Sequence, residues 1–175
     1  YGHGKIADHP DNAKAFMEAA MGEPEQVNAR FNAAREALNK APNVDPAKHY
    51  AIGYCFGGAV VLQQARSGAD LAGVASFHGS LGTESPAEPG VIKARVLVAT
   101  GADDPMVPAQ QVGDFVLEMS AAGAEFELLS FPGVVHSFTN PGATARGKQF
   151  EMPLAYDAHA DSVSWQALLD MLQGQ

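Results

Sequence analysis

Several features are scarce or absent in this sequence, and each absence excludes a class of protein. The 175 residues include one cysteine, which excludes an internal disulfide and a thiolate-rich zinc site. The 11 basic residues are outnumbered by 20 acidic ones, so we expect neither a nucleic acid nor an anionic membrane as partner. No apolar run approaches the roughly 20 residues that span a bilayer. The 46% of hydrophobic residues is nevertheless enough to form a folded core.

Motifs for metals and cofactors are also missing. His3 and His9 have no third donor at a metal-ligand spacing. The glycines of segment 53–58 do not match the dinucleotide-binding pattern, and Gly4-Lys5 lacks the upstream glycine of a phosphate-binding loop. We therefore expect no metal ion and no cofactor. No export signal opens the chain, so the expected location is the cytoplasm, and no pattern indicates an oligomeric state.

Hydrophobic patterning predicts an alternation of strands and helices from residue 49 onward. The expected strands are 49–54, 71–77, 94–100 and 126–131. The expected helices are 11–21, 25–40, 57–66, 108–122 and a terminal helix whose apolar face carries Trp165, Leu168, Leu169 and Leu172, preceded by a long loop. This order predicts an α/β fold, in which helices flank a mostly parallel sheet, as a single domain over residues 1–175. Four strands make a thin sheet, and the chain opens on Tyr1 without an initiator methionine, so we expect further strands upstream.

The strongest chemical signal is Gly-Tyr-Cys-Phe-Gly-Gly at 53–58, between a predicted strand and a predicted helix. This pattern is a nucleophile elbow with Cys55 in place of serine. We expect positions 53 and 57 to require a small residue, because a Cβ there would collide with the turn or with the neighbouring strand. The helix N-terminus favours a thiolate, and the Phe56 N–H is the expected oxyanion donor. The alternative is a buried, inert thiol.

A nucleophile needs a base and a group that orients the base. Asp103 and Asp104 directly follow a buried strand, and His136 lies in the loop after the next one. The carboxyl ends of parallel strands share one edge of the sheet, so these side chains should meet there. We choose Asp104 as the orienting carboxylate, with Asp103 second, although an ordinary turn would also place acids here. The order Cys55, Asp104, His136 matches that of α/β-hydrolase triads.

The other histidines carry weaker signals. His78 ends a strand at the same edge, where it lines a pocket or serves a structural role. His49 opens a strand and His159 lies near the start of the terminal helix, so we assign both to structure.

Together these motifs resemble the dienelactone hydrolase family of α/β-hydrolases over nearly the whole chain. The cysteine elbow, the Asp-Pro-Met-Val-Pro motif from Asp104 and the His-Ser-Phe motif from His136 are similar to those of the family. The opening Tyr-Gly-His-Gly resembles the segment after the family's third strand. The resemblance implies that further strands lie upstream of Tyr1. It also implies that a second oxyanion donor comes from the loop after the third strand and that a glutamate assisting the cysteine lies further upstream, and neither residue can be assigned in this sequence.

The resemblance also bears on the substrate. Family members that hold a carboxylate use two arginines, at the positions where this chain has His3 and Asn140. Without these arginines, bidentate recognition of a carboxylate is lost, so we expect a neutral small ester or lactone. The expected pocket residues are Tyr1, His3, His78, Phe138 and Asn140.

The sequence therefore predicts a hydrolase that uses a Cys55–His136–Asp104 triad and an acyl-thioester intermediate. Two alternatives remain open. One is a non-catalytic fragment or subunit that acts as a binding module, and the other is a thiol-based sensor.

Overall fold

The computed structural model describes residues 4–174. These residues divide into two compact units, one that ends at Pro46 and one that begins at Ala47. The first unit holds two helices, α1 (Pro10–Met21) and α2 (Pro24–Asn39). None of the residues of either helix is buried. The expectation that residues 1–175 form a single domain stays a prediction.

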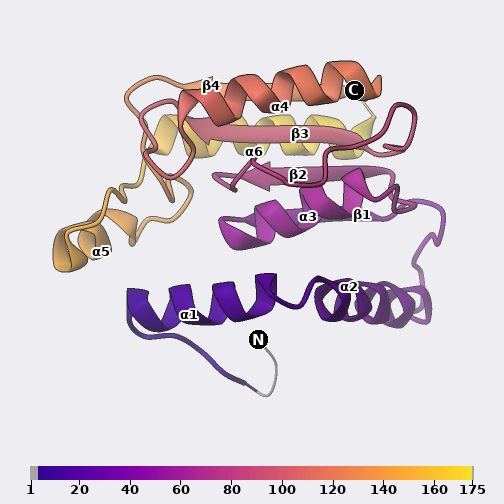
Figure 1. Ribbon diagram of the computed structural model, residues 1–175, viewed down its shortest axis with the longest axis horizontal. Helices are drawn as coiled ribbons and strands as arrows, with labels where there is room; N and C mark the ends of the chain where they lie inside the picture. The colour runs from indigo at the N-terminus through magenta and orange to yellow at the C-terminus, as the bar shows by residue number, and fades with distance from the viewer. Residues whose placement is uncertain (1–3, 175) are drawn as a thin grey trace. The chain divides into compact units, whose positions relative to one another are not determined.

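The second unit is built on a four-stranded parallel sheet in the order β1-β2-β3-β4 (Figure 1). The strands are β1 (Tyr50–Tyr54), β2 (Gly73–Phe77), β3 (Arg95–Gly101) and β4 (Phe126–Phe131). The helices of this unit are α3 (Phe56–Arg66), α4 (Ala109–Ala122), α5 (Ala143–Phe150) and α6 (Ala158–Gln173). The predicted α/β class and the parallel sheet are confirmed.

Helices cover both faces of this sheet. Ser76 of β2 faces α3, since a Cβ on Gly58 of that helix would collide with the serine oxygen. Alternate residues of a strand point to opposite faces, so Ala75 and Phe77 face the other way. There they join a buried cluster with Leu168 of α6. Figure 1 shows the same arrangement, with α3 on one side of the sheet and α6 on the other.

The expected apolar face of the terminal helix is partly wrong. Leu168 is 0% exposed, but Trp165 is 50% exposed and Leu172 is 39% exposed. The side chains of α6 that are buried are Ala160, Ser164, Leu168 and Met171. Small residues at two of these positions let the helix approach the sheet closely, while the bulky residues beside them remain in solvent.

Helix α5 was expected to be part of a long loop. Its buried residues are Ala143 and Gly147, which give no hydrophobic periodicity. Gly147 lies against the carbonyl of Leu154, where a Cβ would collide, so the helix packs through its backbone. The starts of two helices differ by one residue from the expected residues 11 and 108. Helix α1 begins at Pro10 and is capped by His9, whose Nδ1 accepts a hydrogen bond from the Asp11 N–H. Helix α4 begins at Ala109, with Pro108 as its N-cap.

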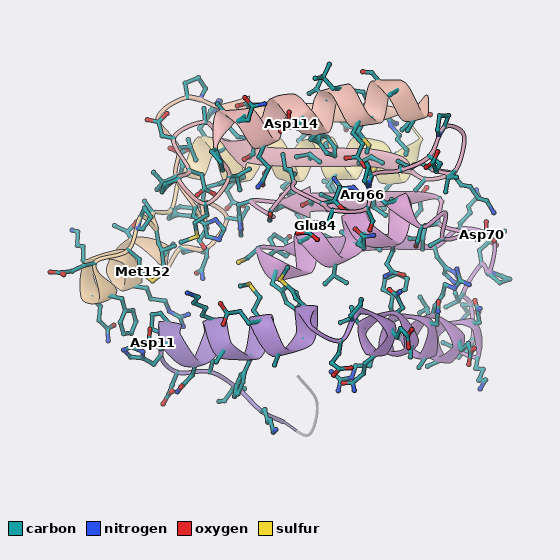
Figure 2. All side chains as sticks on the ribbon, viewed as in Figure 1. Asp11, Arg66, Asp70, Glu84, Asp114 and Met152 are labelled. Atoms are coloured by element: carbon teal, nitrogen blue, oxygen red, sulfur yellow. The ribbon has the colours of Figure 1, made fainter. Side chains whose placement is uncertain are left out.

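A buried ion pair fixes the loop that follows β2. Arg66, labelled in Figure 2, comes from α3 and makes two hydrogen bonds of 2.8 Å to the carboxylate of Glu118 in α4. The same guanidinium donates to the carbonyl of Leu81, and Glu118 accepts from the N–H of Ala87. The loop is therefore tied at two points to both helices, which holds its first residues at the carboxyl edge of the sheet.

The packing of α6 generates a stability prediction. Leu168→Ala should lower the free energy of unfolding by about 2–5 kcal/mol, because the side chain is fully buried against the sheet. Leu117→Ala is the matched control, since Leu117 of α4 is 71% exposed, and it should change stability by less than about 0.5 kcal/mol. Urea unfolding, monitored by circular dichroism, measures the free energy of unfolding of both variants. Equal losses in the two variants would contradict the packing described here.

Candidate active site

Cys55 lies in the tight turn between β1 and α3, with a φ of 52° and a ψ of −119°. Its N–H donates to the carbonyl of Phe77 in β2, and its carbonyl accepts from Gly58 at the start of α3. A positive φ is costly for a non-glycine residue, and here hydrogen bonds on both sides of the cysteine enforce it. The side chain is exposed at the carboxyl edge of the sheet.

The glycines around the turn have different roles. A Cβ on Gly53 would overlap the carbonyl of Gly57, and one on Gly58 would overlap the hydroxyl of Ser76. A Cβ on Gly57 would have no neighbour within 4 Å in the described structure, apart from its own turn of helix. The steric requirement is therefore confirmed at Gly53 and wrong at Gly57, since that Cα faces open space.

Asp104 and His136 are joined by a hydrogen bond. Asp104 lies just beyond β3 and His136 beyond β4, and these strands are neighbours in the sheet. The His136 Nδ1 lies 2.8 Å from Oδ2 of Asp104, and both side chains are buried. The other carboxylate oxygen accepts from the N–H of Met106 at 2.8 Å. This backbone donor has no signature in the sequence, but it leaves both oxygens of Asp104 partnered.

The second candidate carboxylate has a different partner. Asp103 accepts a hydrogen bond from the N–H of Gly133 at 3.2 Å, which ties the β3 loop to the β4 loop. The structure thus joins Asp104, rather than Asp103, to His136.

The thiol and the imidazole change each other's protonation. The hydrogen bond from His136 is the main cause that lowers the pKa of Cys55, and it outweighs the opposing effect of partial burial. The charge of His136 and the N–H of Phe56 lower this pKa further. Burial alone would lower the pKa of His136, but hydrogen bonds to Asp104 and Cys55 raise it to about 9. The pairing therefore favours the thiolate of Cys55 and the imidazolium of His136 over the protonation states that the two groups have when isolated.

His78 lies beside His136. Their ring centroids are 5.0 Å apart in an edge-to-face arrangement. Burial, and then the charge of His136, lower the pKa of His78 to about 4. His78 is therefore neutral under conditions in which His136 is charged.

The other expected pocket residues are distributed differently. Tyr1 and His3 lie outside the described residues. Phe138 is 0% exposed and belongs to the buried cluster beneath the site. The prediction that Phe138 lines the pocket is therefore wrong. Asn140 is exposed, and its side-chain oxygen accepts from the N–H of Gly142 in the turn before α5. The His-Ser-Phe motif thus serves both the core and the site.

Residues 4–174 contain neither a cluster of metal ligands nor a membrane-spanning helix. No group of three or more histidine, cysteine, aspartate or glutamate side chains in this range could hold a metal ion. No helix in the same range is both long and apolar enough to cross a bilayer.

Comparison with known proteins identifies the family. The model of the dienelactone hydrolase family matches residues 1–175. The chain belongs to the dienelactone hydrolase family.

The chain is also similar to individual proteins and solved structures. An uncharacterized protein of Caenorhabditis elegans is 33% identical over 153 residues, which cover 85% of this chain and 93% of that protein. The dienelactone hydrolase-like promiscuous phosphotriesterase P91, from metagenomic libraries, superposes with a TM-score of 0.86 at 33% identity. A structure named m3DLH superposes with a TM-score of 0.88, also at 33% identity. In both structural comparisons the match covers 99% of this chain and 71% of the other.

The electrostatics of this dienelactone hydrolase-family site predict the pH dependence of thiol alkylation. The thiolate is the reactive form, so the iodoacetamide rate should reach half its maximum at a pH below the pKa of about 8.5 of a free cysteine. In His136→Ala the midpoint should rise, because that variant loses the hydrogen bond and the positive charge that lower the pKa of Cys55. Mass spectrometry of the labelled protein at a series of pH values gives both midpoints. A midpoint that is the same in both proteins would contradict the thiol–imidazole pairing.

Proposed function

We propose that this chain hydrolyses small neutral esters or lactones. In this proposal Cys55 is the nucleophile, His136 transfers protons and Asp104 orients the imidazole. The observation that carries the proposal is the unbroken chain of contacts from the Asp104 carboxylate through His136 to the exposed thiol of Cys55. Such a chain can deliver a thiolate and an adjacent proton donor to one carbonyl group.

The reaction takes place in two halves. The thiolate of Cys55 attacks the carbonyl carbon, and the carbonyl electron pair moves to oxygen, where the Phe56 N–H stabilises the negative charge. The adduct collapses, the C–O bond breaks, and the leaving alkoxide takes the proton of His136. The neutral imidazole then removes a proton from water, the hydroxide attacks the thioester, and Cys55 leaves as a thiolate. Asp104 holds the Nδ1–H, so that Nε2 is the nitrogen that exchanges protons.

The choice of nucleophile favours esters over amides. A thiolate is a good leaving group, so the adduct of an amide reverts unless its amine is protonated first. The alkoxide or enolate of an ester or lactone competes better with the thiolate. This argument supports carboxylic esters and lactones as the substrate class.

The charge of the site supports a neutral substrate. The segments that follow the four strands contain Asp103 and Asp104 and no lysine or arginine; they are 55–58, 78–83, 102–108 and 132–142. An anionic substrate would find no guanidinium or ammonium group in these segments, all of which the structure describes. Phosphotriesters are also neutral, and the similarity to P91 makes them a second candidate substrate class.

Two other functions predict different behaviour. A binding module would be folded but would turn over no ester. A thiol sensor would form a sulfenic acid at Cys55 under mild peroxide and would also lack esterase activity. The hydrogen-bonded Asp104 supports hydrolysis over both, because neither alternative needs an oriented imidazole.

Removal of the thiol tests the proposed nucleophile. Cys55→Ala should lower the turnover of p-nitrophenyl acetate by at least about 10³-fold, because the covalent step is lost. Cys55→Ser should retain part of the activity, since a hydroxyl can replace the thiol as nucleophile. Circular dichroism should show that both variants are folded. Wild-type turnover by folded Cys55→Ala would rule out this nucleophile.

The two neighbouring aspartates provide a matched pair of variants. Asp104→Asn should lower kcat by about 10²–10⁴-fold, because an amide hydrogen can hold the imidazole in the wrong tautomer. Asp103→Asn changes the same chemistry one residue away and keeps an oxygen for the Gly133 N–H, so kcat should stay within about twofold of wild type. Steady-state kinetics on purified proteins measure both effects. Equal losses in the two variants would refute the role given to Asp104.

A further inference from the structure

His78 is a buried second imidazole that the proposed reaction does not use. It directly follows β2, is 3% exposed and has a φ of 42°. Its N–H donates to the carbonyl of Ala99 at 2.8 Å, which extends the β2–β3 pairing by one residue. The backbone strain and the burial of a polar ring are both unfavourable, so neither persists without a structure that enforces it.

The ring of His78 touches the loop that carries His136 at several points. It lies edge to face with His136, at 5.0 Å between centroids, and with Phe138, at 5.3 Å. Its Nε2 lies 3.0 Å from the hydroxyl of Thr139, three residues after His136. The buried Nδ1 has no hydrogen-bond partner within the described part of the chain. The bond to Thr139 is therefore the polar contact that orients this ring.

The loop needs such anchors because its backbone is strained. Ser137, immediately after His136, has a φ of 62°. A non-glycine residue in this region costs about 1–3 kcal/mol and persists only where its surroundings determine the conformation. The surroundings include backbone hydrogen bonds to the carbonyls of His136, Ser137 and Phe138, which come from the N–H groups of Ala155, Asn140 and Asp157. The buried ring of Phe138 and the bond between His78 and Thr139 add to them.

The neutral state of His78 is compatible with its position beside His136. Its pKa is lowered to about 4, first by burial and then by the charge of His136, whereas Asp104 acts in the opposite direction. A neutral ring can lie against a charged imidazole at 5.0 Å without repulsion. A cation at this position would repel His136, and a carboxylate would compete with Asp104 for its proton.

We propose that His78 is a positioning residue, whose edge-on contact with His136 and hydrogen bond to Thr139 hold the imidazole of His136 in line between Asp104 and Cys55. The inference rests on the proposed hydrolase function. It adds a residue that acts through His136 rather than on the substrate.

Three variants test this role. Thr139→Val removes the hydroxyl with little change of shape, His78→Phe keeps an aromatic ring but loses the hydrogen bond, and the third variant combines both changes. Each single change should lower kcat about 10-fold with KM nearly unchanged, since misplacement of a catalytic group slows the chemical step. The double variant should be no slower than the slower single variant, because both remove one bond. Ser67→Ala is the control, since its hydroxyl donates to the carbonyl of Gln64 at the C-terminal end of α3, the end opposite Cys55.

The alkylation midpoint of Cys55 separates positioning from stability. If His136 is displaced, the midpoint should rise toward that of a free thiol in both single variants and stay unchanged in Ser67→Ala. Lower thermal stability with an unchanged kcat and an unchanged midpoint would overturn the proposal, as would losses that simply multiply in the double variant. If the wild type turns over no ester, the proposed function fails. The midpoint in Thr139→Val then still decides the role of His78.

Discussion

The hydrogen bond between Asp104 and His136 is the contact on which the candidate site depends. It joins the ends of two neighbouring parallel strands, β3 and β4, across 32 residues of sequence. The bond is possible because parallel strands present their carboxyl ends at one edge of a sheet. The bond, at 2.8 Å, also helps raise the pKa of His136. The hydrogen bond and the charge of His136 in turn lower the pKa of Cys55. The geometry of the fold and the chemistry of the thiol are therefore linked through one buried pair.

Backbone strain is concentrated at this same edge. Five non-glycine residues in the described part of the chain have a positive φ, and three of them, Cys55, His78 and Ser137, belong to the site or its support. Such conformations are unfavourable locally and are retained where packing and hydrogen bonds determine them. Here the strain exposes the thiol, turns the His78 ring into the core and directs the chain after His136. The packing of the helices on the sheet stabilises these three strained conformations.

Much of this organisation could be predicted from the sequence, because it depends on local signals. The elbow around Cys55, the acids after a buried strand and the histidine after the next strand are each marked by nearby glycine, proline or apolar residues. Features that depend on close packing had no such signal. Helix α5 buries a glycine, α6 packs through small residues while Trp165 stays in solvent, and Phe138 points into the core. The bond between His78 and Thr139 spans 61 residues and follows from tertiary structure alone.

The covalent intermediate gives the most direct test of the account. Wild-type protein mixed with p-nitrophenyl acetate, quenched in acid within the first turnover and digested, should carry one acetyl group on the peptide that contains Cys55. The adduct should be removed by hydroxylamine, as a thioester is, and it should be absent from Cys55→Ala. An ester hydrolysed at full rate with no acetyl group on Cys55, or with the acetyl group on another residue, would contradict the account.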